Sequence, residues 1–88
     1  MEDSAAKNTI FGDLAQVEKT LSDDTSGDRA RAMVAYFDDV AKSSEQMLLK
    51  AGSDAERQLL TRLIDGFRAA QRIIRHVWET LHTAALPA

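Results

Sequence analysis

The sequence predicts an all-α fold, an antiparallel helical hairpin with an additional short N-terminal helix. Apolar residues recur at helical spacing in three segments, about residues 9–21, 28–51 and 54–84. The single proline of the 88-residue chain is Pro87, so no proline interrupts these segments. A chain of this length makes one small domain.

Composition excludes several classes of protein. The chain has no cysteine, so it has no disulfide and no thiolate metal site. A net charge of -3 argues against a nucleic-acid-binding protein. The apolar runs are short and the N-terminus is acidic, so we expect no membrane insertion, no secretory signal and a cytoplasmic location. We expect a flexible N-terminus over residues 1–8, a single helical domain over 9–84 and a tail over 85–88.

The first expected helix spans about residues 9–21 and follows a cap at Asn8 or Thr9. Its apolar residues form one narrow stripe, with the spacing of a coiled-coil seam. They are Ile10, Leu14, Val17 and Leu21. A helix this short is marginal alone in water, and it either lies against the hairpin or detaches from it.

The second expected helix follows a turn-rich acidic linker, residues 22–28. Ser26 or Asp28 is its expected cap, and Gly52 is expected to end it as a C-terminal glycine. Apolar side chains share one face of this helix. They are Met33, Phe37, Val40, Met47 and Ala51.

The third expected helix begins at a capping box, the S-x-x-E pattern of residues 53–56, and runs to about residue 84. The short linker before it predicts antiparallel packing on the second helix. The apolar stripe is regular: Leu60, Leu63, Phe67, Ala70, Ile74, Val77 and Leu81. With its flanking residues it covers roughly half of the circumference, more than one neighbouring helix can cover. The excess favours oligomerisation or a permanent partner, and docking of the first helix is the alternative.

Residues typical of catalytic or metal sites are sparse. Glu79 and His82 have the E-x-x-H spacing of di-iron bundles, but such a site needs a second copy and two inward-facing carboxylates. His76 and His82 are six residues apart and do not share a face. We therefore expect no catalytic residue, no bound metal, no cofactor and no enzymatic activity.

Two further features leave alternatives open. Arg68, Arg72 and Arg75 form a basic row, which is either a solvated face paired with Asp65 and Glu79 or a site for an acidic partner. Gly66 lies inside the third helix, where small residues permit close approach. Either the second helix or a partner makes that approach.

The segment 52–82 resembles a known family. Its Gly-Ser-Asp-Ala turn and the helix ending Ala-Gln-Arg-Ile-Ile-Arg-His-Val-Trp-Glu-Thr-Leu-His are similar to the C-terminal helix of the YscE/SsaE/EscE proteins. Those are small cytoplasmic E components of type III secretion needles. In that family an Ile-Ile pair is followed three residues later by an apolar residue, as with Ile73, Ile74 and Val77 here.

The resemblance implies a co-chaperone. Proteins of that family pair with a helical-repeat chaperone of the YscG type, and together the two hold the needle subunit unpolymerised in the cytoplasm. The implied recognition is a helix in a groove, with Trp78 as the strongest anchor. The predicted partner-contacting residues are Phe37, Phe67, Ala70, Ile74, Val77 and Trp78.

A second hypothesis is a self-associating helical bundle that acts as a structural or regulatory oligomer. In that case a copy of the chain, rather than a different protein, covers the wide apolar arc of the third helix. A needle-like subunit is a related alternative, although the turn at residues 51–54 lacks the proline of needle proteins.

Overall fold

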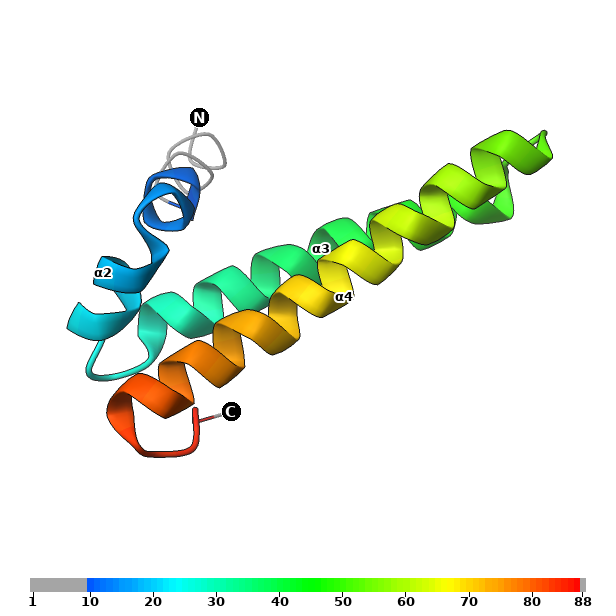
Figure 1. Ribbon diagram of the computed structural model, residues 1–88. Coiled ribbons are helices and arrows are strands. Elements are labelled where there is room, and N and C mark those ends of the chain that lie inside the picture. The colour runs from blue at the N-terminus through cyan, green and yellow to red at the C-terminus, as the bar shows by residue number, and fades with distance from the viewer. Residues whose placement is uncertain (1–9, 88) are drawn as a thin grey trace.

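The computed structural model describes residues 10–87 and confirms the all-α fold (Figure 1). A helical stretch at residues 10–15 is followed by α2 (Val17–Asp23), α3 (Asp28–Leu49) and α4 (Asp54–His82). Helices α3 and α4 lie side by side and antiparallel as a long hairpin, and the N-terminal helices cross one end of it (Figure 1). The expected flexibility of residues 1–8 lies outside the described residues.

The expectation of one continuous helix over residues 9–21 is wrong, because the helix breaks at Gln16. The backbone of Gln16 has φ -131° and ψ 47°. Its N–H donates to the carbonyl of Asp13 (3.2 Å), and its own carbonyl accepts from the N–H of Thr20 (2.9 Å), which starts α2. The break changes the helix direction, and Thr20 and Leu21 on α2 are buried. Tertiary burial therefore overrides the uniform stripe seen in the sequence.

The start of α3 differs from both predicted caps. Gly27 is the N-cap residue, with a left-handed φ of 83° that glycine adopts without strain. The carboxylate of Asp24 accepts from the backbone N–H groups of Arg29 (3.2 Å) and Ala30 (2.9 Å), and it thereby caps the helix. The hydroxyl of Ser26 accepts from the N–H of Asp28, the first residue of α3, at 3.2 Å, but Ser26 lies one residue before the N-cap.

The end of α3 also differs from the prediction. The helix ends at Leu49, and Lys50 closes it in a right-handed conformation. Gly52 does not take a positive φ. The position that requires a glycine is Gly27 instead. Its φ is positive, and an added Cβ would lie 2.8 Å from a methyl group of Leu86.

Helix α4 begins at the predicted capping box, which is confirmed. The hydroxyl of Ser53 accepts from the N–H of Glu56 at 3.2 Å. The helix ends at His82, and Thr83 follows in a left-handed conformation, φ 46°. The chain then turns back, and the N–H of Leu86 donates to the carboxylate of Glu79 at 2.9 Å. Leu86 is buried, so the predicted tail packs on the hairpin through this residue.

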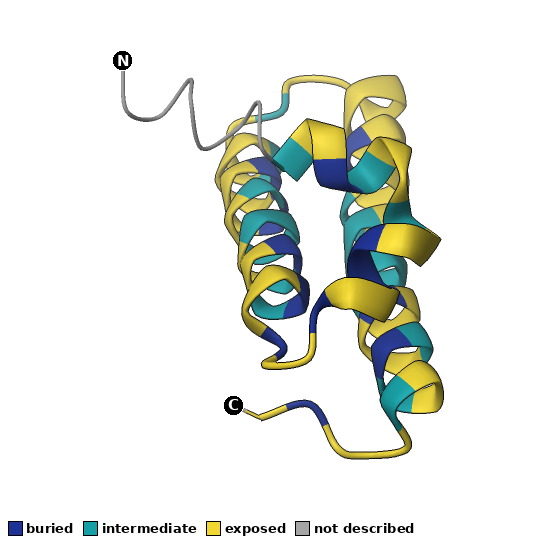
Figure 2. Ribbon diagram, turned by 90° about the vertical axis from the view of Figure 1, so that its left-hand side faces the viewer, coloured by how far each residue is buried: buried dark blue, intermediate teal, exposed yellow. Residues whose placement is uncertain are grey.

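The core lies at one end of the hairpin. We call this end the base: residues 10–23 and 83–87 pack there on α3 and α4. The other end, which carries the turn at residues 50–53, is the tip. The buried cluster at the base comprises Leu21, Ala30, Met33, Ile74, Trp78 and Leu86. Exposed residues predominate at the tip (Figure 2).

Candidate interaction surface

Two of the predicted contact residues lie inside the core of the base. Trp78 is 3% exposed, and its indole N–H donates to the carbonyl of Asp24 at 2.7 Å. The indole stacks on the ring of His82, with 4.5 Å between ring centroids. Ile74 is buried in the same cluster. In this conformation both side chains hold the chain's own helices together and are not accessible to a partner.

The other four predicted residues are half-buried. Phe37 of α3 stacks on Phe67 of α4, with 6.3 Å between ring centroids. Ala70 and Val77 follow on α4, and Val77 packs against the core cluster. Each of these side chains keeps some exposed surface, so their contact with a partner stays a prediction.

The largest exposed apolar side chains of the hairpin are concentrated toward the tip. We call four of them the tip residues: Met47, Leu49, Leu59 and Leu63. They are 42–80% exposed. Met47 and Leu49 are two residues apart, so they project about 200° apart around α3. Apolar surface therefore lies on more than one side of the two-helix arm.

Helix lengths could have located this surface from the sequence. Helix α4 has 29 residues and is therefore about 44 Å long. The N-terminal helices over residues 10–23 extend at most about half of that length. They can cover only one half of the apolar arc, so among the described helices none is left to cover Leu59 and Leu63 at the other half.

An ion-pair network occupies one face of the hairpin. The carboxylate of Asp38 binds Lys42 (2.8 Å) and Arg68 (2.7 Å), and Arg68 also contacts Glu45 at 3.3 Å. The hydrogen bond from Lys42, followed by that from Arg68, lowers the pKa of Asp38. The hydrogen bond to Asp38 raises the pKa of Lys42.

This network corrects the expected pairing of the basic row. Arg68 binds carboxylates of α3 rather than Asp65 of its own helix. Glu79 binds the backbone of Leu86 instead of an arginine of the row. Within residues 10–87, Arg72 and Arg75 have no carboxylate within ion-pair distance. The solvated-face interpretation therefore fits two of the three arginines.

A groove of about 400 Å³ opens at the base between α2 and α4. Val17, Val77 and Leu81 form its apolar part. The remaining lining residues, Glu18, His76 and Thr80, are polar. This groove is where the apolar arc of α4 emerges from beneath the N-terminal helices.

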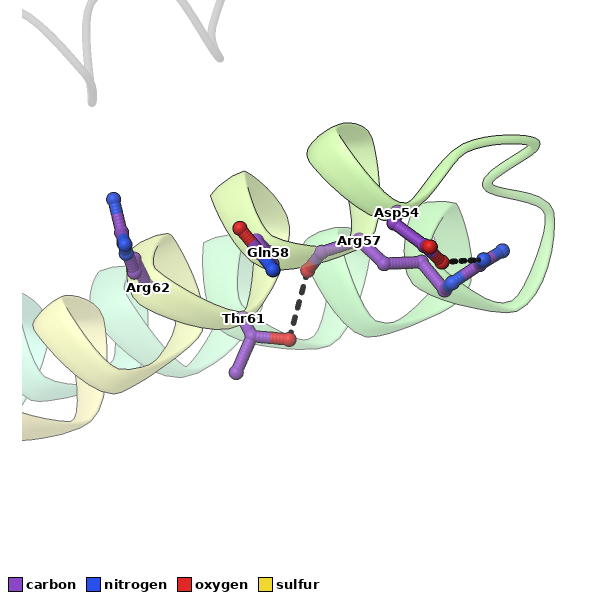
Figure 3. Close-up of a pocket in the computed structure, with 5 residues that line it drawn as sticks. All are labelled: Asp54, Arg57, Gln58, Thr61 and Arg62. Atoms are coloured by element: carbon purple, nitrogen blue, oxygen red, sulfur yellow. Dashed lines mark hydrogen bonds and ion pairs between the residues drawn. The ribbon is translucent and has the colours of Figure 1, made fainter.

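A second depression, about 380 Å³, lies at the start of α4 and is lined by polar and charged residues (Figure 3). Arg57 pairs there with Asp54, and the hydroxyl of Thr61 donates to the carbonyl of Arg57 at 2.8 Å. Arg62 points away from the other residues that line the depression (Figure 3). These contacts fix the first turns of α4 and bring no nucleophile next to a base.

Residues 10–87 contain neither a cluster of metal ligands nor a membrane-spanning helix. No group of three or more histidines and acidic residues in this part of the chain could hold a metal ion. None of the helices described is long and apolar enough to cross a membrane.

The comparisons with known proteins identify one family. A model of the family "Type III secretion system regulatory protein HrpD6" matches residues 3–80, which include α2, α3 and nearly all of α4. No curated protein and no solved structure matches the chain. The finer resemblance of residues 52–82 to needle E components stays a prediction. Because the family model matches most of the chain, the chain belongs to the HrpD6 family of type III secretion regulatory proteins.

Proposed function

We propose that this protein serves type III secretion as a co-chaperone. It binds a helical-repeat chaperone in the bacterial cytoplasm, and the pair helps to keep the needle subunit soluble and unpolymerised. Its role is binding rather than catalysis. The family supports the link to secretion. The co-chaperone role rests on the resemblance of residues 52–82 and on the surface of the tip.

The observation that carries this proposal is the exposure of the tip residues. Leu49 is 80% exposed and Leu59 is 59% exposed, on a two-helix arm that no other part of residues 10–87 covers. Exposed apolar surface that is contiguous over several large side chains marks interaction sites in soluble proteins. Since they lie on more than one side of the arm, a concave partner that encloses the arm buries more of them than a flat one. Helical-repeat proteins present such concave surfaces.

The distribution of charge also favours the tip as the end of the hairpin that binds the partner. Residues 42–72 contain six basic and four acidic side chains, whereas the whole chain is acidic. Lys50 and Arg62 lie near the tip residues in the sequence, and among the described residues neither is in an ion pair. A partner with acidic groups around its apolar groove is therefore favoured.

The proposal moves the predicted contacts along the hairpin. Trp78 and Ile74 are committed to the core, so a partner that binds the folded chain uses the tip residues first. Phe67 and Ala70 lie next to them on α4 and extend the surface toward the base. Phe37 and Val77 are the other two predicted contact residues that are half-buried.

Co-expression with the helical-repeat chaperones and the needle subunit of the same secretion system tests this function. We expect a complex of discrete mass by size-exclusion chromatography with light scattering, and a needle subunit that stays unpolymerised only in that complex. The double variant Met47→Ser, Leu49→Ser is expected to weaken the complex at least tenfold, because two apolar side chains lose their burial.

Phe11→Ser is the matched control, because Phe11 is about as exposed as Met47 but lies at the base against Tyr36. It should leave the affinity unchanged. If no chaperone of the system co-purifies, or if the control weakens the complex as much as the double variant, the proposal is wrong.

A further inference from the structure

A second apolar line runs along α4, beside the face that packs on α3. Leu60, Phe67 and Ile74 form the face toward α3. The second line, which we call the α4 stripe, is spaced alternately by four and three residues, as in a helix–helix seam. It comprises Leu59, Leu63, Gly66, Ala70, Ile73 and Val77. Its residues from 59 to 73 lie beyond the groove that α2 forms with α4.

Gly66 at the centre of the α4 stripe has no role in the packing of the monomer. It is exposed, and a Cβ placed on it would meet nothing within 4 Å. Glycine destabilises a helix interior relative to alanine. Close packing by the second helix, one of the two alternatives that the sequence left open, is therefore not the reason for this glycine. The other alternative, approach by another chain, remains.

We propose that a second copy of this chain packs antiparallel on the α4 stripe. In this register Leu59 of one copy opposes Val77 of the other, and Leu63 opposes Ile73 in the same way. At the centre Gly66 of each copy opposes Ala70 of the other. Large side chains thus meet at both ends and small ones in the middle, so the helices approach most closely where the small residues lie. The stripe is complementary to itself when it is reversed.

The groove at the base supplies the site for the end of the partner helix. In the antiparallel register, Leu59 of the second copy arrives beside Val77, where Val17 and Leu81 form the apolar part of the groove. The volume of about 400 Å³ is ample for one leucine side chain. The 59% exposed Leu59 of each copy is thereby covered by the other.

Charges at the two ends of the stripe match this arrangement. Arg62 is one turn beyond Leu59 and projects away from its neighbours (Figure 3). In the dimer it comes level with residue 74 of the other copy, within one turn of His76, and approaches Glu18, which lines the same groove as His76. Within residues 10–87 neither Arg62 nor Glu18 takes part in an ion pair. Two symmetric Arg62–Glu18 pairs therefore form across the interface.

The interface is small. It involves one pair of helices over about five turns, which is roughly 27 Å. This gives less than the roughly 800 Å² per partner of a standard protein interface, so we expect a weak, reversible dimer with a dissociation constant on the order of 100 µM. The dimer goes beyond the proposed function, because it requires no other component of the secretion system.

Sedimentation equilibrium of the isolated full chain tests the dimer. We expect the mass to rise from 9.7 kDa toward twice that value as the concentration passes through the expected range. Gly66→Leu fills the centre of the stripe and should weaken association at least tenfold. The same variant should raise the Tm of the monomer, because the side chain meets no neighbour and leucine favours the helix. Loss of association cannot then result from misfolding.

Ala35→Leu is the matched control, since it places the same side chain at an exposed position of α3. It should leave association unchanged. Arg62→Glu and Glu18→Arg should each weaken the dimer by at least threefold, and the combined variant should restore it. A chain that stays monomeric well above 100 µM, or association that survives Gly66→Leu, overturns the proposal. Failure of the combined variant to restore binding overturns the register. Neither result bears on the chaperone complex, which is measured separately.

Discussion

The base and the tip belong to the same two helices but bury their apolar residues to very different degrees. At the base, Leu21 and Met33 are fully buried, and Trp78 is nearly so. At the tip, Leu60 is buried between the helices, whereas Leu49 and Leu59 remain exposed. The periodicity of the two halves is alike. Within the described part of the chain, the difference is the third layer, which residues 10–23 and 83–87 supply at the base and not at the tip.

The comparison shows that one wide apolar arc can be buried along one half of a helix and exposed along the other half. Two helices alone bury one narrow stripe each, and the rest of the arc needs a further neighbour. At the tip, local interactions hold the helix instead. Ser53 caps it, Arg57 pairs with Asp54, and the hydroxyl of Thr61 binds the carbonyl of Arg57. The tip is therefore ordered as a helix while its apolar side chains stay available.

The strongest test of the contrast is removal of the buried indole at the base. Trp78→Ala should lower the free energy of unfolding by about 3–5 kcal/mol, because it opens a cavity and leaves the carbonyl of Asp24 without its donor. Urea denaturation followed by circular dichroism measures this change. A loss below about 1 kcal/mol would mean that the base is not the stable core of this protein.

The caps provide the next test, because one lies at each end. Asp24→Ala removes two hydrogen bonds from a buried carboxylate at the start of α3, and about 1–2 kcal/mol of stability should be lost. Ser53→Ala removes the exposed cap of α4 at the tip, and the loss should be about 0.5–1 kcal/mol. Thermal unfolding of both variants should show this order, and the reverse order would contradict the contrast.

A smaller effect on stability is expected when the pH is lowered. The pKa of Asp38 is lowered in the folded state by Lys42 and Arg68. Its contribution to stability is therefore present above its ordinary pKa, about 4, and is lost as the pH falls through the lowered folded value. Asp38→Asn should lower the Tm slightly at pH 7, where the charged carboxylate contributes, and this difference from the unsubstituted chain should shrink as the pH falls below about 4. An unchanged acid profile would show that the network contributes no stability.

The smallest effect is expected at the tip itself. Leu59→Ser should change the stability of the monomer by less than about 0.5 kcal/mol, because the side chain is mostly exposed and leaves no cavity. Denaturation at a protein concentration well below the expected dimer range measures it. A loss comparable with that of Trp78→Ala would mean that Leu59 is buried in solution and that the two ends do not differ.

Much of the hairpin could be predicted from local sequence. The apolar spacing of residues 28–51 and 54–84 indicates two long helices, and the S-x-x-E pattern at Ser53 marks the start of the second. These signals depend on residues within one or two turns of each other. For the same reason the excess width of the arc on α4 was visible in the sequence, and with it the expectation that something else must cover it.

The site was harder to predict, because its accessibility depends on distant parts of the chain. Trp78 has the residue type of an interface anchor, yet Asp24, far from it in sequence, and Leu86, beyond the end of α4, enclose it. Leu59 and Leu63 belong to the same arc and remain exposed because the N-terminal helices are too short to reach them. Residue type and periodicity are the same at both ends, so neither distinguishes a core position from a surface position.

Local chemistry therefore accounts for the helices of the hairpin and for the turn between them. Long-range packing decides the break at Gln16, the capping of α3 by Asp24 and the docking of Leu86. The physical reason is the range of the forces involved. Backbone hydrogen bonds and helix caps act over a few residues, whereas burial depends on which segments meet in space. Only the folded chain decides which half of α4 forms the core and which half is left for a partner.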